Sequence, residues 1–348
     1  MASITIENVS VLFGSQINID AGLKIADRGL SSIEIKAGTA AVLGVHNCCL
    51  EVQGGETLVL MGLSGSGKST LLRTVNGLVM PSRGDVKILH EGKIFCIKKL
   101  RMKELQYVRR NIVSMVFQQF GLFPWRTVAE NVRLGLEIAG ISKIRSQFIV
   151  MEQLELVGLA SWADRQVCEL SGGMQQRVGL ARAFATGAPI LLMDEPFSAL
   201  DPLIRKHLQK ELKLLQSHLK KTIIFVSHDL EEAIHMGDRI VIIKDGRIIQ
   251  KGTPKDIIVS PVNSYVAEFV GHINPLRFLT AGDIMRPYDK EKAKNSFCAI
   301  AKSETLLADL VKAIRRMPGH IGVVDKGFLI GIISPEDILL NLKNKKNF

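Results

Sequence analysis

The sequence has no apolar run that approaches the roughly 20 residues needed to cross a bilayer. Its richest apolar stretches, such as residues 57–62 and 190–193, have the length of buried strands. Residues 1–11 show no basic region followed by an apolar core, so we expect no secretory signal and a chain that stays in the cytoplasm. If the protein serves a membrane, another chain must therefore span it.

Cysteine is also scarce, and its spacing argues against a zinc or redox site of the CxxC type. The five cysteines are Cys48, Cys49, Cys96, Cys168 and Cys298. We expect them to be buried or half-buried thiols in a reducing compartment.

The composition indicates a folded protein, and 348 residues are enough for one large and one small domain. Hydrophobic residues make up 47%, far from a disordered composition. The net charge of +11 would suit nucleic acid, an anionic membrane surface or an anionic nucleotide as partner. We interpret the densest basic stretch, residues 93–110, as a solvated face, with contact to acidic lipid headgroups or a partner as the alternative.

Residues 1–270 alternate between strand and helix patterns, which predicts an α/β domain. The short apolar runs at 189–194 and 222–227 are typical of parallel strands buried on both faces. Thr127 and Glu130 form a capping box for a helix that reaches Gly140. Further expected elements are an extended segment at 3–13, a short helix within 14–38, a β-rich stretch at 51–61, a helix ended by Gly77, a helix from Ser171 to about Gly187 and a hairpin over 238–252.

The pattern changes near Gly271, and residues 271–279 form a predicted linker around Asn274-Pro275. Residues 280–348 then form a small α+β segment that contains a β-α-β-β-α order. Its expected elements are a strand at 297–301, a helix at 304–316 capped by Ser303, strands at 321–324 and 328–333, and a last helix that begins at Ser334-Pro335.

A glycine-rich loop between a predicted strand and helix matches the phosphate-binding pattern G-x-x-x-x-G-K-[ST]. Its N–H groups and the helix N-terminus direct positive charge inward. Lys68 can reach the β- and γ-phosphates, and the Ser69 hydroxyl can occupy one Mg²⁺ position. The loop and the residue after it comprise Gly62, Leu63, Ser64, Gly65, Ser66, Gly67, Lys68, Ser69 and Thr70. We therefore expect a nucleotide with Mg²⁺ at this loop.

An acidic pair, Asp194 and Glu195, follows the buried run 190–193. Such a run ends at the carboxyl edge of the sheet, where ligands bind in open α/β folds. Asp194 would hold Mg²⁺, and Glu195 would orient the attacking water or accept its proton. An acidic pair after a strand is often only a helix cap, but the phosphate loop in the same chain favours the functional interpretation.

Residues 170–177, Leu-Ser-Gly-Gly-Met-Gln-Gln-Arg, resemble the signature motif of ABC-type ATPases. Ser171 and the amides of Gly172 and Gly173 can bind a γ-phosphate at a helix N-terminus. The resemblance implies a P-loop NTPase fold with a RecA-like core, an antiparallel β subdomain and a helical subdomain. In this family the signature motif completes the site of a second subunit, which implies a homodimer that encloses two ATP molecules.

Three further residues follow in the order of that family. Gln118, in Val116-Phe117-Gln118, is similar to the Q-loop glutamine that senses Mg²⁺ and the permease. Asp201, at the end of residues 198–201, is similar to the D-loop aspartate, and His228 to the switch histidine that contacts the γ-phosphate. The resemblance implies catalytic roles for Lys68, Gln118, Glu195 and His228.

The same resemblance implies partners and a location. The partners would be integral-membrane permease subunits and, indirectly, a substrate-binding protein, with no nucleic acid. The chain would lie peripherally at the cytoplasmic face of the inner (plasma) membrane.

Two longer phrases, residues 115–132 and 197–205, are similar to importer ATPases for quaternary ammonium osmoprotectants, and so is the insertion 14–38. Substrates in that group are glycine betaine, proline betaine, carnitine or choline. An importer of another small solute such as an amino acid is one alternative. A soluble nucleic-acid-associated ABC ATPase is another, but such proteins usually have paired ATPase domains or coiled-coil insertions, which this chain lacks.

Three questions stay open at the ends of the chain. Phe13, which Gly14 follows, either stacks on adenine or packs in the core. Residues 280–343 resemble a single CBS motif, half of a module, which would pair across the dimer as a regulatory or dimerisation segment. Ser334 and Asp337 in this segment either contact a ribose or phosphate or serve the last helix as a cap.

Overall fold

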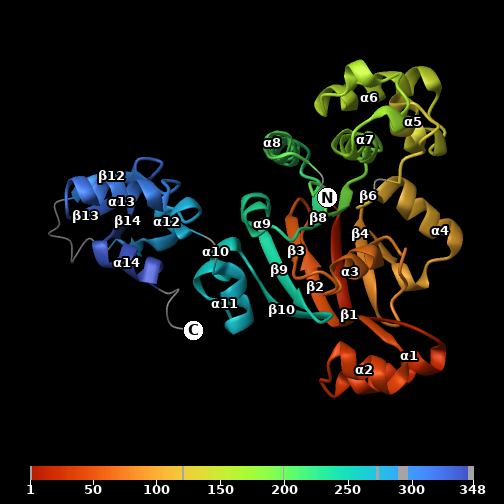
Figure 1. Ribbon diagram of the computed structural model, residues 1–348. Coiled ribbons are helices and arrows are strands. Elements are labelled where there is room, and N and C mark those ends of the chain that lie inside the picture. The colour runs from red at the N-terminus through yellow and green to blue at the C-terminus, as the bar shows by residue number, and fades with distance from the viewer. Residues whose placement is uncertain (1, 120, 199, 272–273, 289–296, 344–348) are drawn as a thin grey trace. The chain divides into compact units, whose positions relative to one another are not determined.

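The computed structural model describes residues 2–119, 121–198, 200–271, 274–288 and 297–343 (Figure 1). Ala199 of the predicted D-loop and parts of the predicted linker and C-terminal segment lie outside these residues. The chain divides into two compact units, Met1–Asp229 with Met236–Ile249, and Leu230–His235 with Gln250–Phe348. Within the described ranges, no helix is both long and apolar enough to pass through a membrane.

A six-stranded sheet forms the centre of the first unit, in the order β10-β9-β3-β8-β7-β6. Every residue of β3, β7 and β8 is buried, as the continuous apolar runs predict. The pairs from β9 to β6 are parallel, so the carboxyl ends of these strands meet at one edge. The strands are β3 (Thr57–Met61), β6 (Val113–Val116), β7 (Ile190–Asp194), β8 (Thr222–Val226), β9 (Arg239–Lys244) and β10 (Arg247–Gly252).

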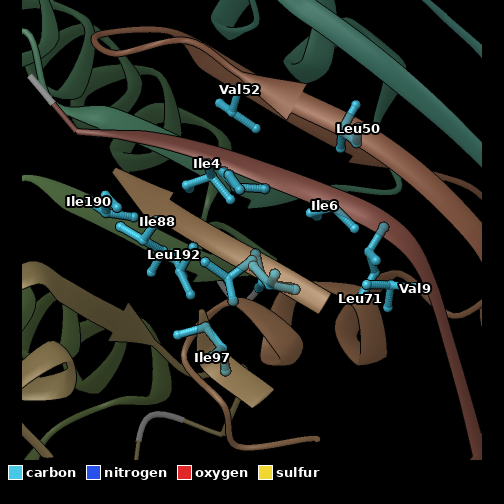
Figure 2. Close-up of a cluster of buried hydrophobic side chains, with 14 of the residues drawn as sticks. Ile4, Ile6, Val9, Leu50, Val52, Leu71, Ile88, Ile97, Ile190 and Leu192 are labelled. Carbon is cyan, nitrogen blue, oxygen red and sulfur yellow. The ribbon is translucent and has the colours of Figure 1, made fainter. Parts of the chain in front are cut away.

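A second, antiparallel sheet has the order β2-β1-β4-β5. Figure 2 shows Ile4 and Ile6 of this sheet in one apolar cluster with Leu71 and with Ile190 and Leu192 of the parallel sheet. Its strands are β1 (Ser3–Phe13), β2 (Val42–Val52), β4 (Arg83–His90) and β5 (Lys93–Cys96). The predicted β-rich stretch at 51–61 was therefore placed too late, because β2 already begins at Val42.

The helices α5, α6 and α7 pack against one another as a group (Figure 1). The predicted capping box is confirmed, since the Thr127 amide donates to Glu130 Oε2 at 2.9 Å and the Glu130 amide to Thr127 Oγ1 at 3.2 Å. The helices of this unit are α1 (Gln16–Asp27), α2 (Ser32–Thr39), α3 (Lys68–Val75), α4 (Met102–Tyr107), α5 (Val128–Ile138), α6 (Lys143–Leu156), α7 (Gly172–Ala185) and α8 (Pro202–Leu219), with short turns at Ile97–Lys99, Val108–Ile112, Ala160–Trp162 and Val167–Glu169.

The insertion between β1 and β2 contains two helices, whereas the sequence led us to expect one. Ser15 caps α1, and Ser31 with Glu34 forms a capping box for α2, so each helix has its own start signal. The guanidinium of Arg83 on β4 donates to both carboxylate oxygens of Asp27 at the end of α1, at 2.8 and 2.7 Å. This bidentate pair fastens the insertion to the antiparallel sheet.

The second unit contains a four-stranded sheet in the order β11-β14-β13-β12. Its core gathers apolar residues of the sheet and of three helices, among them Ile284, Leu307, Ile321, Ile333 and Ile338. The β-α-β-β-α order predicted from the sequence is present. Its elements are α9 (Leu230–Met236), α10 (Pro254–Val259), α11 (Ser264–Val270), a turn at Pro275–Arg277, α12 (Ala281–Ile284), β11 (Arg286–Pro287), β12 (Phe297–Lys302), α13 (Leu307–Arg316), β13 (His320–Asp325), β14 (Phe328–Ile333) and α14 (Pro335–Lys343).

The start predicted for α13 was wrong by three residues. The Ser303 amide donates to the carbonyl of Val324, and the Ser303 carbonyl accepts from Gly282. Since the backbone of Ser303 is engaged with neighbouring segments, it cannot begin a helix, and α13 starts at Leu307. Ser334 does cap α14, because its Oγ accepts from the Asp337 amide at 3.2 Å.

Candidate functional site

The phosphate-loop sequence joins β3 to α3 at the carboxyl edge of the parallel sheet. Gly67 has φ +100° and precedes the first turn of α3, and Gly62 has φ +149°. A Cβ at Gly62 would collide with the carbonyl oxygen of Ile243, and one at Gly67 with that of Gly44. Glycine is therefore required at both positions, by backbone angle and by the closeness of neighbouring chain.

Lys68 directs its ammonium into this loop. Its Nζ donates to the carbonyl oxygens of Gly62 at 2.9 Å and Leu63 at 2.8 Å, and the residue is 5% exposed. Burial lowers the pKa of Lys68, and the carboxylates of Glu195 and Asp194 oppose that shift. The two carbonyl oxygens therefore hold the ammonium group of Lys68 within the loop.

The side chains predicted to hold the metal lie together. Ser69 Oγ is 2.6 Å from Oδ1 of Asp194, the last residue of β7, and Nη2 of Arg73 is 3.0 Å from Oδ2. A hydroxyl and one carboxylate are the hard oxygen ligands that Mg²⁺ takes from protein when nucleotide phosphates supply others. Across the described ranges, no cluster of three or more His, Cys, Asp or Glu side chains could hold a metal by itself. The donor set thus fits a metal that binds together with a nucleotide.

Glu195 lies between two other predicted residues. Its Oε2 is 3.4 Å from Nε2 of Gln118 and 3.4 Å from Nδ1 of His228. Gln118, Glu195 and His228 follow β6, β7 and β8, which are adjacent strands of the parallel sheet. Segments far apart in the sequence therefore meet at one point of the sheet edge.

The signature residues begin α7. Ser171 is its N-cap, and Ser171 Oγ accepts from the amide of Met174 at 3.4 Å. Gly172 and Gly173 form the first turn, with Ser171 and Gly172 exposed to solvent. An exposed helix N-terminus of this kind can receive an anion.

Asp201 is the N-cap of α8. Its Oδ1 accepts from the amides of Leu203 at 3.1 Å and Ile204 at 3.0 Å. The carboxylate thus has a structural task within its own chain, and its part in a nucleotide site remains a prediction.

Phe13 stands at the end of β1 with 46% of its surface exposed, so it does not pack in the core. A Cβ on Gly44 would lie 3.0 Å from the Phe13 ring and 2.9 Å from the methyl group of Thr70. The Phe13 ring and Thr70, in the first turn of α3, therefore both lie next to Gly44 of β2. The insertion does not carry Phe13 away from the phosphate loop.

Two residues of this region were missed by sequence reasoning. Arg73 lies four residues after Ser69, hence on the same face of α3, and that spacing could have revealed it. Gln176, on α7, donates from Nε2 to the carbonyl oxygen of Glu195 at 3.3 Å. No local signal in the sequence predicts this second contact.

Comparison with known families and proteins agrees with this geometry. The ABC transporter family model matches residues 45–198. The glycine betaine/carnitine transport ATP-binding protein GbuA of Listeria monocytogenes is 43% identical over 95% of this chain and 83% of its own length. The trimethylamine N-oxide transport ATP-binding protein TmoW of Ruegeria pomeroyi is 42% identical over 97% of both chains.

Solved structures show the same fold. The dimeric ATP-binding cassette MJ0796 in a post-hydrolysis state, bound to ADP and Pi, aligns with a TM-score of 0.62 and 31% identity over 72% of this chain and 98% of that one. The chain belongs to the ABC transporter family of ATP-binding proteins. It has the ABC ATPase cassette fold, and the ABC-type ATPase predicted from residues 170–177 is confirmed. Its resemblance to the ATP-binding proteins of quaternary-amine transporters is confirmed as well.

Proposed function

We propose that the protein is the ATP-hydrolysing subunit of an importer that takes up a quaternary ammonium compound, such as choline or glycine betaine, through a separate permease. The observation that carries this proposal is the meeting of Gln118, Glu195 and His228 beside the Ser69–Asp194 pair. Relatives named for glycine betaine, carnitine and trimethylamine N-oxide transport support the class of substrate. These solutes share a trimethylated nitrogen.

The positions of the site residues support the following roles. Lys68 and the amides of the phosphate loop would bind the β- and γ-phosphates of ATP. Ser69, Gln118 and Asp194 would hold Mg²⁺, which would neutralise charge on the phosphate oxygens. Glu195 would orient the attacking water and accept its proton, and His228 would contact the γ-phosphate.

Two copies of the chain would form the working unit. Ser171, Gly172 and Gly173 of each copy would bind the γ-phosphate held by the other, so that two ATP molecules lie between the chains. The dimeric form of the related cassette MJ0796 supports this arrangement. Closure on ATP and opening after hydrolysis would drive the permease.

The remaining partners and the location belong to the same proposal. Permease subunits would anchor the chain at the cytoplasmic face of the membrane, and a substrate-binding protein would deliver the solute. We expect no nucleic acid.

We retain a three-part division of the chain as a proposal: an ATPase domain at 1–270, a linker at 271–279, and a single CBS-like segment at 280–348 that regulates or dimerises. The hydrogen bonds of Asp337 support a structural role for this residue, since its carboxylate accepts from Arg286 Nε at 2.7 Å and from the Ser334 amide at 2.9 Å.

Removal of the residues after Gly271 should change the response of transport to ionic strength if the segment is a sensor. An unchanged response would leave dimerisation as its role.

The decisive experiment reconstitutes the protein with its permease and binding protein in proteoliposomes. ATP hydrolysis and solute uptake are measured with choline, glycine betaine and trimethylamine N-oxide. Stimulation by choline or glycine betaine supports the proposal and names the substrate, whereas stimulation by trimethylamine N-oxide alone would replace the quaternary ammonium class by an amine oxide. Hydrolysis that none of them stimulates would contradict the substrate class.

A further inference from the structure

Gln176 lies in the second turn of α7 and is almost completely buried, with 1% of its surface exposed. Its Nε2 donates to the carbonyl oxygen of Glu195 at 3.3 Å. Its Oε1 is also buried and has no hydrogen-bond partner in the described part of the chain. A buried amide with an unsatisfied oxygen costs stability, so the fold tolerates a polar side chain where an apolar one would pack more favourably.

The backbone that receives this hydrogen bond is itself unusual. Glu195 has φ +50°, a left-handed conformation that costs a non-glycine residue roughly 1 kcal/mol or more. Its carbonyl oxygen also accepts from Ser198 Oγ at 3.1 Å, and its amide donates to the carbonyl of Val226 at 3.2 Å. The direction of the Glu195 carboxylate depends on this held conformation, because the side chain starts from that backbone.

We infer that Gln176 is a positioning residue for Glu195, which it holds through the Glu195 carbonyl oxygen. This inference rests on the proposed roles of Glu195 and of the signature residues. The N-terminus of α7 would serve the partner's ATP, whereas Gln176, about 6 Å further along the same helix, holds the glutamate of its own chain.

Another glutamine provides a matched control. Gln216, on α8, donates from Nε2 to the carbonyl oxygen of Gly55 at 2.6 Å. Its Oε1 is also buried and has no hydrogen-bond partner in the described part of the chain. Gln216 therefore makes the same kind of contact as Gln176, but outside the signature motif and with a backbone other than that of Glu195. A general effect of replacing such a glutamine would appear in both variants.

The test compares Gln176→Met and Gln216→Met in the full-length protein reconstituted with its permease, with Glu195→Gln as reference. In Gln176→Met, kcat for ATP hydrolysis should fall about 10- to 100-fold because the carboxylate loses its alignment. The KM for ATP should stay within about twofold, since the phosphate loop is untouched. The melting temperature should not fall, because the change removes an unsatisfied buried oxygen. Gln216→Met should keep kcat within about threefold.

A second variant tests the hydrogen bond itself. A protonated carboxyl group at position 176 can donate to the Glu195 carbonyl, and an ionised one cannot. Gln176→Glu should therefore gain activity relative to Gln176→Met as the pH is lowered from 8 to 6. If Gln176→Glu is no more active than Gln176→Met at any pH in this range, the positioning role is contradicted.

The remaining outcomes separate this inference from the proposed function. If Glu195→Gln is inactive and Gln176→Met hydrolyses ATP at the wild-type rate, the inference is wrong and the role of Glu195 stands. Equal losses in Gln216→Met and Gln176→Met would also overturn it. If Glu195→Gln hydrolyses ATP normally, the proposed role of Glu195 itself fails.

Discussion

Arg73 and Asp194 form an ion pair that joins the helix after the phosphate loop to the end of β7, with 3.0 Å between Nη2 and Oδ2. The Asp194 side chain is fully buried, and that of Arg73 is 39% exposed. The other carboxylate oxygen of Asp194 accepts the Ser69 hydroxyl at 2.6 Å. Arg73 therefore provides the counter-charge for a buried carboxylate that we propose as a metal ligand.

We predict that Arg73→Gln destabilises the nucleotide-free protein. Removing one partner of a buried pair usually costs several kcal/mol, but the exposure of Arg73 reduces the expected loss to about 1–2 kcal/mol. Mg²⁺ with ATP should restore part of the melting temperature, because the metal supplies the missing positive charge. The melting temperature of Arg73→Gln is measured with ATP in EDTA and with ATP and Mg²⁺, which separates the effect of the metal from that of ATP alone. A restoration that is equally large in EDTA would exclude the metal as its cause.

Glu195→Gln should bind ATP and dimerise but hydrolyse ATP at least about 100-fold more slowly, because an amide cannot accept the proton of the attacking water. Single-turnover hydrolysis and size-exclusion chromatography with ATP measure the two effects. Undiminished turnover would remove Glu195 from its proposed role.

Phe13→Ala should raise the KM for ATP about tenfold and leave kcat nearly unchanged, since base stacking contributes to binding only. Phe13→Tyr should behave like the wild type because it keeps an aromatic face. Phe148 on α6, 77% exposed, provides a control, and Phe148→Ala should leave the KM for ATP unchanged. A comparable KM in Phe13→Ala and the wild type would show that adenine does not stack on this ring.

The buried His46 predicts how stability responds to pH. Burial and the nearby charge of Arg247 lower its pKa, while Asp27, 3.3 Å from Nε2, opposes the shift. The unfolded chain therefore binds a proton more readily than the folded one, and stability should fall as the pH drops below about 6.5. Asp27 does not titrate in this range, because hydrogen bonds from Arg83 hold the pKa of its carboxyl group below its ordinary value.

His46→Asn should accordingly flatten the dependence of the melting temperature on pH between 8 and 5.5. His207→Asn, a change on the exposed surface of α8, is the control and should leave the wild-type slope. An identical slope in His46→Asn and the wild type would mean that other groups control the acid response.

Local signals predicted much of the architecture. The capping box of Thr127 and Glu130 and the glycines of the phosphate loop act over three to six residues, so they can be read from the chain alone. The two helices of the insertion were only partly predicted, although Ser15 and Ser31 are ordinary start signals. The helix start predicted at Ser303 was wrong because the Ser303 backbone forms hydrogen bonds with Val324 and Gly282. The sequence around Ser303 does not reveal those partners.

The sequence by itself determined the class of protein and the residues that could bind a nucleotide, since motif spacing and helix starts depend on neighbouring residues. Only the tertiary structure decided which of these residues meet. The contacts of Glu195 with Gln118, His228 and Gln176 depend on the order of β6, β7 and β8 in the sheet and on where α7 packs. That order is set by long-range burial of apolar strands, which no local pattern of residues specifies.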